Sequence, residues 1–147
     1  MAAMDGKKIL VTGGTTGIGR AIAIELARAG AKVLIFGRHK PELEDALAAL
    51  DDSIGEAEGM IADQSKPEDV QKVFAKAKGM GGLDAVIAHA GISAEGLADL
   101  SEKEWRYAME TNLLGYLDVA KRAVEAFEGR KGDIILIGSM SADKRTK

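Results

Sequence analysis

The chain has 147 residues, of which 46% are hydrophobic and 29% are charged, and its formal net charge is -3, values typical of one soluble globular domain. It contains no cysteine, which excludes disulfides, thiolate metal sites and cysteine nucleophiles, and we expect no metal site. The charge is slightly acidic and the basic residues are dispersed, so we expect no nucleic-acid partner. No apolar stretch is long enough to span a bilayer, so we expect no membrane partner. Residues 1–8 lack a signal-peptide pattern, and we therefore expect a cytoplasmic protein.

The first pattern along the chain is a short apolar run at residues 9–11, followed by a glycine-dense turn and by apolar residues at helical spacing over 21–27. A strand, turn and helix in this order direct the N–H groups of the first helical turn at one point, where the helix dipole favours an anion. A tight turn without a ligand is the alternative. We predict a phosphate site that comprises Gly13, Thr15, Thr16, Gly17, Ile18 and Gly19.

The spacing of this turn distinguishes between nucleotide-binding motifs. A P-loop would place its Lys at Arg20 and its magnesium-binding hydroxyl at Ala21, which disfavours ATP or GTP hydrolysis. The G-x-G-x-x-G fingerprint does not fit either, because three residues separate the first two glycines of the motif. The spacing present is Thr-Gly-x-x-x-Gly-x-Gly. In this motif the chain resembles the short-chain dehydrogenase/reductase family.

Residues 32–37 predict a second strand, and their continuous apolar character is typical of a parallel sheet covered on both faces. In dinucleotide-binding folds an acidic residue after this strand bonds the ribose of NAD, whereas an Arg accommodates the 2′-phosphate of NADP. Arg38 stands here, without a carboxylate, and Pro41 marks a helix start beside it. We therefore expect NADP in preference to NAD, although a solvated basic turn would also explain Arg38.

Residues 57–62 predict a third strand that is less apolar than the others, and we place it at the sheet edge. Asp63 and Gln64 follow this strand directly. The resemblance implies that Asp63 contacts the adenine of the cofactor, with Gln64 in the same site. A compatible alternative is that Asp63 helps to start the next helix, because residues 65–68 have the form of a capping box.

Residues 83–88 predict a fourth strand that leads into His89, Ala90 and Gly91. The family usually has Asn-Asn-Ala-Gly here, so Ala90 and Gly91 agree with it while Ala88 and His89 depart from it. The resemblance implies that residues 89–91 lie against the cofactor. His89 invites interpretation as the proton donor, but we expect a structural hydrogen-bonding role for it.

A long helical pattern covers residues 102–128 and begins at a capping box formed by Ser101 and Glu104. Asn112 lies in its middle, where its side chain competes for backbone hydrogen bonds and predicts a kink. Asn112 also matches the family's Asn-x-x-Gly element, which implies that it holds a water of the proton relay. A kink without a catalytic role is the alternative.

Residues 133–138 predict a fifth strand, and Ser139 follows it at the end of the sheet where ligands bind. The family's catalytic serine follows this strand in the same way, and we prefer Ser139 to Ser141 for that role. The resemblance also implies a catalytic Tyr with a Lys four residues later, and their usual spacing falls beyond Lys147. Neither Tyr107 nor Tyr116 has a Lys four positions on.

Together these elements predict an α/β Rossmann-type fold, a doubly wound parallel sheet in three αβα layers with strand order 3-2-1-4-5. We expect residues 1–147 to form a single dinucleotide-binding domain that is truncated after the fifth strand and inactive alone. The resemblance implies an NADP(H)-dependent oxidoreductase that interconverts a ketone and a secondary alcohol by hydride transfer, as a homodimer or homotetramer. If the chain natively ends here, a non-catalytic dinucleotide-binding module or redox sensor is the alternative.

Overall fold

The computed structural model describes residues 1–93 and 97–139. Five strands form one parallel sheet in the order β3-β2-β1-β4-β5, which confirms the predicted doubly wound α/β fold. The strands are β1 (Lys8–Thr12), β2 (Lys32–Gly37), β3 (Ala57–Ile61), β4 (Ala85–Ala88) and β5 (Asp133–Leu136). β3 lies at the sheet edge and is half-buried, as its weaker apolar character predicts.

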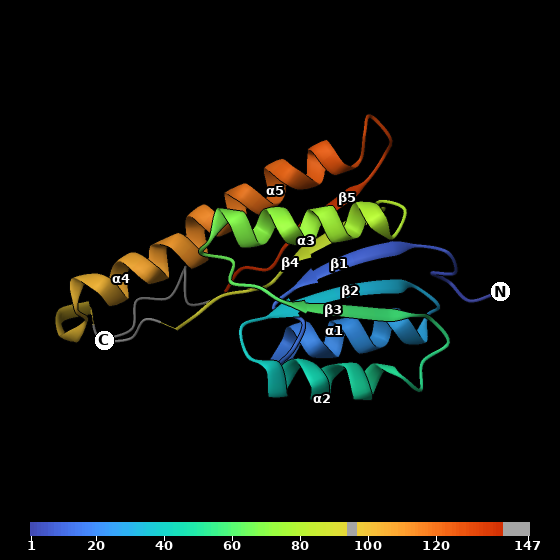
Figure 1. Ribbon diagram of the computed structural model, residues 1–147, viewed down its shortest axis with the longest axis horizontal. Coiled ribbons are helices and arrows are strands. Elements are labelled where there is room, and N and C mark those ends of the chain that lie inside the picture. The colour runs from blue at the N-terminus through green and yellow to red at the C-terminus, as the bar shows by residue number, and fades with distance from the viewer. Residues whose placement is uncertain (94–96, 140–147) are drawn as a thin grey trace.

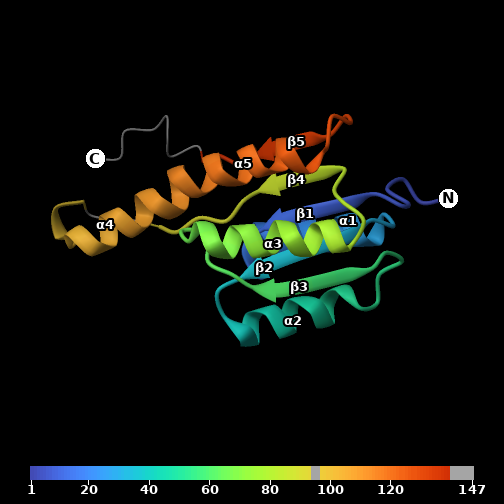
Figure 2. The same ribbon diagram turned by 45° about the horizontal axis from the view of Figure 1, so that its top comes forward.

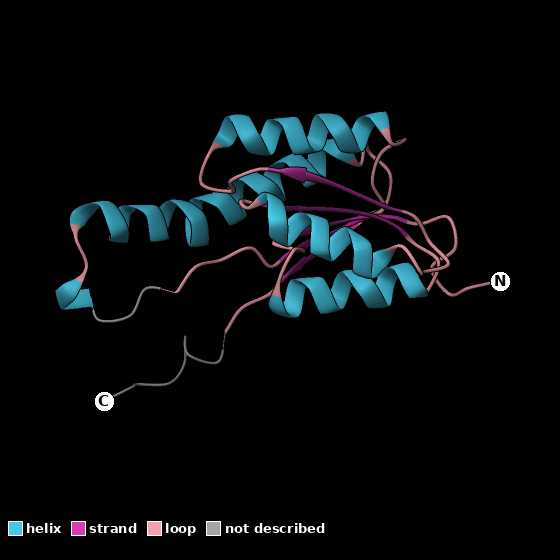
Figure 3. Ribbon diagram, turned by 60° about the horizontal axis from the view of Figure 1, so that its bottom comes forward, coloured by secondary structure: helices cyan, strands magenta, loops and turns pink. Residues whose placement is uncertain are grey.

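Helices cover both faces of the sheet, as Figures 1 and 3 show. α1 and α2 lie on one face, and α3 and α5 pack side by side on the other. α4 extends past the carboxyl ends of the strands (Figure 2). The helices are α1 (Gly17–Arg28), α2 (Lys40–Leu50), α3 (Pro67–Gly79), the short η1 (Leu97–Asp99), α4 (Glu102–Met109), the π-helical η2 (Glu110–Leu114) and α5 (Gly115–Ala126). Among the described residues, every helix is too short or too polar to cross a membrane.

Two apolar cores hold these layers together, one on each face of the sheet. Successive strand residues point to opposite faces, so Leu10 joins the core beneath α3 and α5 while Val11 joins the core beneath α1 and α2. This double coverage explains why the central strands are apolar without interruption. Burial of each large side chain stabilises the fold by about 1.5–3 kcal/mol. The carboxyl ends of the strands are thereby held at one edge.

The long predicted helix is not broken at Asn112. The capping box of Ser101 and Glu104 is present, and α4 runs through η2 into α5 with right-handed helical backbone angles on both sides. Within η2, the N–H of Gly115 donates to the carbonyl of Glu110, five residues earlier. The predicted kink is therefore a π-helical turn, in which the helix widens. Asn112 does not break the helix because its side chain bonds a neighbouring segment and not its own helix backbone.

Candidate functional site

A crevice of about 230 Å³ opens at the carboxyl ends of β1, β2, β3 and β4. The sheet order is built outward from β1 to β3 on one side and from β4 to β5 on the other, so the topological switch point lies between β1 and β4. Open α/β sheets bind ligands at such a point. The crevice is lined by Gly13, Thr15, Thr16, Phe36, Gly37, Arg38, His39, Glu42, Ala62, Asp63, Gln64, His89, Ala90, Gly91, Ile92 and Thr111. Most of the predicted cofactor residues are thus brought together. Gly17, Ile18, Gly19, Asn112 and Ser139 are outside this lining.

The glycine turn, residues 13–19, packs closely against the end of β4. A Cβ on Gly13 would come within 2.7 Å of the Ala90 Cα. A Cβ on Gly19 would collide with the Gly13 carbonyl oxygen and lie 2.9 Å from His89 Nδ1. Gly13 and Gly17 have φ of 64° and 54°, a region that favours glycine. Glycine is therefore required for the turn to close against the crevice wall.

The first turn of α1 supplies hydrogen-bond donors at this position. α1 begins at Gly17, and the backbone of Thr16 before it is extended. Among the described residues, the Thr16 side chain makes no capping hydrogen bond to the helix. The first N–H groups of an α-helix have no partner within the helix, and the helix dipole adds partial positive charge there. The turn therefore has the chemistry of an anion site.

Thr12 joins the two strands that border the crevice. Its side chain is fully buried, and its Oγ1 accepts hydrogen bonds from the backbone N–H groups of His89 and Ala90, both at 2.9 Å. These two N–H groups follow the last residue of β4. One hydroxyl at the end of β1 thus fixes the backbone that forms the opposite wall.

Gln64 lines the crevice from a buried position. Its Nε2 donates to the carbonyl oxygens of Ala90 at 3.2 Å and Thr111 at 2.9 Å. The Thr111 carbonyl belongs to the π-helical turn, and a Cβ on Gly115 would lie 2.7 Å from Gln64 Cγ. Gln64 therefore joins the ends of β3 and β4 to η2, and its amide nitrogen is occupied by bonds within the protein.

Asn112 joins η2 to the segment after β4. Its Oδ1 accepts from the N–H of Ile92 at 2.9 Å, and its Nδ2 donates to the carbonyl of Ile92 at 2.8 Å. The side chain thus satisfies both backbone groups of one crevice residue. π-Helical turns occur frequently at functional sites. The candidate catalytic residue Asn112 consequently positions Ile92, next to Gly91 in the crevice wall.

Asp63 lies at the far end of the crevice, after β3. Its Oδ1 accepts from the Ser65 N–H at 2.9 Å and the Ser65 hydroxyl at 2.7 Å, and its Oδ2 accepts from the Tyr107 hydroxyl at 3.0 Å. Burial acts to raise the pKa of Asp63, but these hydrogen bonds and the charge of Arg38 outweigh it and hold the pKa below its ordinary value. Asp63 is therefore a carboxylate at neutral pH.

The predicted capping box over residues 65–68 does not form. The N-cap of α3 is Lys66, and the Ser65 hydroxyl donates to Asp63 and does not cap the helix. The Asp69 carboxylate accepts from the backbone N–H of Asp63 at 3.0 Å. The Ser65 hydroxyl donates its proton to the Asp63 carboxylate in a charge-assisted hydrogen bond, so Asp63 closes the turn that precedes α3.

Arg38 extends from the end of β2 toward α4. Its Nη1 donates to the Tyr107 hydroxyl at 2.9 Å, and its guanidinium carbon lies 5.7 Å from the centroid of the Tyr107 ring. Tyr107 thus contacts both predicted residues at this end, Arg38 and Asp63. Tyr107 was named from the sequence only to exclude it as the family's catalytic Tyr, and no local motif identifies it as a partner of residues 69 and 44 positions away.

His89 lies between the glycine turn and the crevice. Burial lowers the pKa of its imidazole, so the ring is neutral at physiological pH. Its buried Nδ1 has no hydrogen-bond partner within residues 1–93 and 97–139. His89 is therefore a neutral side chain that packs against Gly19 and forms part of the crevice wall.

Ser139 is exposed and lies three residues past the end of β5. Nearby, the Tyr116 hydroxyl donates to the carbonyl of Ile137 at 3.3 Å, and burial raises the pKa of Tyr116. The competing candidate Ser141 lies outside the described residues. The fifth strand ends at Leu136, two residues before the predicted end, although the Ile137 N–H still donates to the Ala88 carbonyl.

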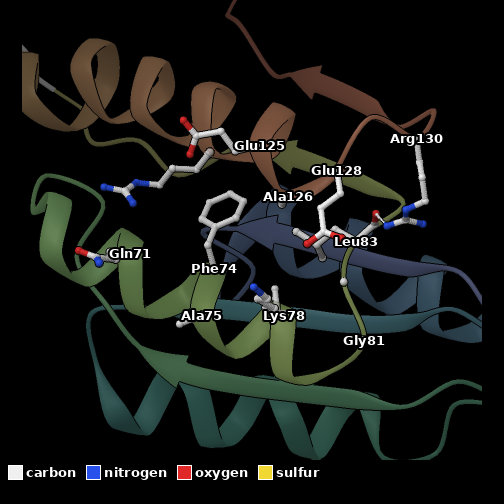
Figure 4. Close-up of a pocket in the computed structure, with 13 residues that line it drawn as sticks. Gln71, Phe74, Ala75, Lys78, Gly81, Leu83, Glu125, Ala126, Glu128 and Arg130 are labelled. Carbon is white, nitrogen blue, oxygen red and sulfur yellow. Dashed lines mark hydrogen bonds between the residues drawn. The ribbon is translucent and has the colours of Figure 1, made fainter.

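A second hollow, a groove of about 590 Å³, lies between α3 and α5 and beside the loops that enter β4 and β5 (Figure 4). Phe74 and Ala126 supply apolar surface, while Lys78, Glu125 and Arg130 supply charges of both signs. These loops precede the strands, so the groove is at the amino ends of β4 and β5. The predicted site residues are all at the other end of the sheet. We therefore assign the chemistry of the fold to the smaller crevice.

Comparison with known proteins agrees with this geometry. The family model for short chain dehydrogenases matches residues 7–147. The chain is 36% identical over 140 residues to a 3-oxoacyl-(acyl-carrier-protein) reductase FabG of Vibrio cholerae, covering 93% of this chain and 56% of the relative. It is 34% identical over 140 residues to a hydroxysteroid 11-beta-dehydrogenase 1-like protein of Danio rerio, covering 93% and 49%.

Solved structures give the same result. A short-chain type dehydrogenase/reductase from Mycobacterium ulcerans superimposes with a TM-score of 0.90 at 27% identity, covering 97% of this chain and 55% of that one. Actinorhodin polyketide ketoreductase with NADPH superimposes with a TM-score of 0.90 at 30% identity, covering 99% and 58%. The chain thus spans about half the length of the curated relatives that it matches. The family model, these matches, the glycine turn and the parallel sheet together show that the chain belongs to the short-chain dehydrogenase/reductase family.

Proposed function

We propose that this chain is the coenzyme-binding part of an NADP(H)-dependent oxidoreductase that interconverts a ketone and a secondary alcohol by hydride transfer. The observation that carries the proposal is the position of Arg38 at the crevice, in the same cavity as the glycine turn. Glu42 also lines this end, but the residues directly after β2 are Arg38, His39 and Lys40, without a carboxylate to bond a free ribose 2′-hydroxyl. This arrangement favours NADP over NAD.

The residues of the crevice fit a dinucleotide. The glycine turn packs closely against Ala90 and itself, and the first N–H groups of α1 that follow it suit a pyrophosphate. In our proposal Gly13, Thr15, Thr16, Gly17, Ile18 and Gly19 hold that pyrophosphate. Arg38 bonds the 2′-phosphate and Asp63 the adenine. His89, Ala90 and Gly91 form the wall against a ribose, supported from behind by Gln64.

When bound, NADP(H) supplies the hydride chemistry. We propose that the Ser139 hydroxyl donates a hydrogen bond to the substrate oxygen, which polarises a carbonyl toward reduction. Asn112 supports the proton relay by holding the segment after β4, since both polar groups of its side chain bond Ile92. A small-molecule carbonyl or alcohol is the expected substrate class.

We propose a cytoplasmic enzyme that forms a homodimer or homotetramer through α5 and η2. Leu113, Leu117 and Val124 are exposed on these helices, and an exposed apolar stripe of this kind suits a symmetric helix interface.

Equilibrium titration of the full-length protein with NADPH and NADH, followed by coenzyme fluorescence, tests the proposal. We expect tighter binding of NADPH, and NADPH oxidation with at least one member of a panel of ketones. Binding without oxidation of any panel member would favour the non-catalytic module. Magnesium-dependent binding of ATP or GTP, with no coenzyme binding, would contradict the proposal.

A further inference from the structure

The Tyr107 side chain of α4 bonds two residues that line the coenzyme crevice, Arg38 and Asp63. Its hydroxyl lies 2.9 Å from Arg38 Nη1 and 3.0 Å from Asp63 Oδ2. The three residues come from the end of β2, the end of β3 and α4, and Figures 1 and 2 show α4 projecting beyond the strand ends. A single oxygen therefore joins three segments at one end of the crevice.

The direction of each hydrogen bond follows from the partners. Asp63 is a carboxylate and only accepts, so the single proton of the Tyr107 hydroxyl is directed at Oδ2. Arg38 only donates, so it bonds a lone pair of the same oxygen. The other carboxylate oxygen of Asp63 is held by Ser65. The orientation of the hydroxyl is thus fixed before any ligand arrives.

This arrangement determines what Arg38 offers to a ligand. The guanidinium has five N–H donors in a planar fork, and the bond to Tyr107 uses one side of it. Within residues 1–93 and 97–139 the remaining donors make no other hydrogen bond, which leaves them for a phosphate. The Tyr107 hydroxyl lies between the positive charge of Arg38 and the negative charge of Asp63, and both groups bond the hydroxyl. Without this hydroxyl, Arg38 would be free to pair with Asp63 directly or to turn into solvent.

We propose that Tyr107 is a positioning residue that sets the preference for a 2′-phosphorylated coenzyme. It holds the exposed Arg38 side chain at the crevice and keeps it from pairing with Asp63. The inference rests on the proposed function, because it assumes that Arg38 receives the 2′-phosphate.

The test compares wild-type protein with Tyr107→Phe, Arg38→Ala and the double variant, all in the full-length chain. The affinity for NADPH and NADH is measured by calorimetry in the absence of substrate, and 2′,5′-ADP and 5′-AMP repeat the comparison on the adenosine half alone. Tyr116→Phe is the matched control, because its hydroxyl bonds the Ile137 carbonyl away from this end of the crevice. Circular dichroism checks the folding of each variant, and Tyr107→Phe keeps the ring beside Arg38 while it removes the hydroxyl.

We expect Tyr107→Phe to weaken NADPH and 2′,5′-ADP binding about fivefold to tenfold, which corresponds to one net hydrogen bond. NADH and 5′-AMP binding should change less than about twofold, as should all binding to the control. In the Arg38→Ala background, Tyr107→Phe should have almost no further effect, because the residue that it positions is gone.

The inference would be overturned if Tyr107→Phe left the preference for NADPH over NADH unchanged, whether or not it weakened the binding of both. It would also be overturned if Tyr107→Phe weakened NADPH binding as much in the Arg38→Ala background as in wild type. Either result would leave NADP dependence intact. If wild-type protein binds NADH as tightly as NADPH, the proposed coenzyme preference fails, and the role of Tyr107 fails with it.

Discussion

The hydroxyl of Thr12 provides a sharp test of how the crevice is built. Thr12→Val replaces that hydroxyl by a methyl group of nearly the same size. The backbone N–H groups of His89 and Ala90, each now 2.9 Å from Thr12 Oγ1, would lose their common acceptor. The side chain is fully buried, so water has no direct route to replace the oxygen.

The magnitude follows from these two bonds. An unsatisfied buried donor costs about 1–3 kcal/mol, and because His89 and Ala90 are only half-buried we expect about 2–4 kcal/mol for the pair. Thr12→Ser keeps the oxygen and loses one buried methyl group, which costs about 1 kcal/mol. The two variants therefore separate the hydrogen bonds from the packing.

Urea unfolding of the full-length protein, followed by circular dichroism, measures both effects. At about 1–3 kcal/mol per molar urea, Thr12→Val should lower the midpoint by about 1–2 M relative to wild type. Thr12→Ser should lower it by less than half of that amount. A Thr12→Val protein as stable as Thr12→Ser would refute the assignment of this hydroxyl as the acceptor that joins β1 to β4.

Three further predictions concern Gly19 in the glycine turn and the crevice residues Arg38 and Asp63. Gly19→Ala should destabilise the fold by about 1–3 kcal/mol in thermal unfolding and abolish measurable NADPH binding, because its Cβ collides with the turn; unchanged binding would contradict the close packing. Arg38→Ala should cost about 1.5–3 kcal/mol of NADPH binding free energy in a fluorescence titration and leave NADH nearly unaffected, whereas equal losses would dissociate Arg38 from the 2′-phosphate. The lowered pKa of Asp63 means that its carboxylate stabilises the fold above the unfolded pKa, near 3.8, and that this stability is lost as pH falls through the lower folded pKa. The stability difference between wild type and Asp63→Asn should therefore be constant at neutral pH and shrink in acid, and a difference that grows in acid would reverse the sign of the pKa shift.

The sheet and the glycine turn are predictable from the sequence because their signals are local. Continuous apolar runs identify buried parallel strands, and glycines at fixed offsets identify a backbone that must approach a ligand or a neighbour. The strand order then follows from alternation of strands and helices with right-handed connections. Arg38 was assigned to the crevice because it follows the second strand without a carboxylate beside it, whereas Asp63 was assigned there from the family resemblance.

The connections between segments could not be predicted in the same way. Tyr107 meets Arg38 and Asp63 only because α4 extends past the strand ends, and the partners are 69 and 44 residues apart. Gln64 was predicted in the cofactor site and lines the crevice, but the bonds of its amide nitrogen to the carbonyls of Ala90 and Thr111 have no local sequence signal. Asn112 predicts an irregular helix. Whether that helix breaks or widens depends on Ile92, because the backbone of Ile92 bonds the Asn112 side chain. Such outcomes depend on tertiary contacts that local patterns do not encode.

The glycine turn should receive the pyrophosphate of a dinucleotide, and a crystal structure of the full-length protein with NADPH tests this most directly. We predict the pyrophosphate at the first N–H groups of α1 and the 2′-phosphate at Arg38. A coenzyme bound elsewhere, such as in the groove between α3 and α5, would contradict the account, as would a turn whose N–H groups are filled by the protein's own side chains.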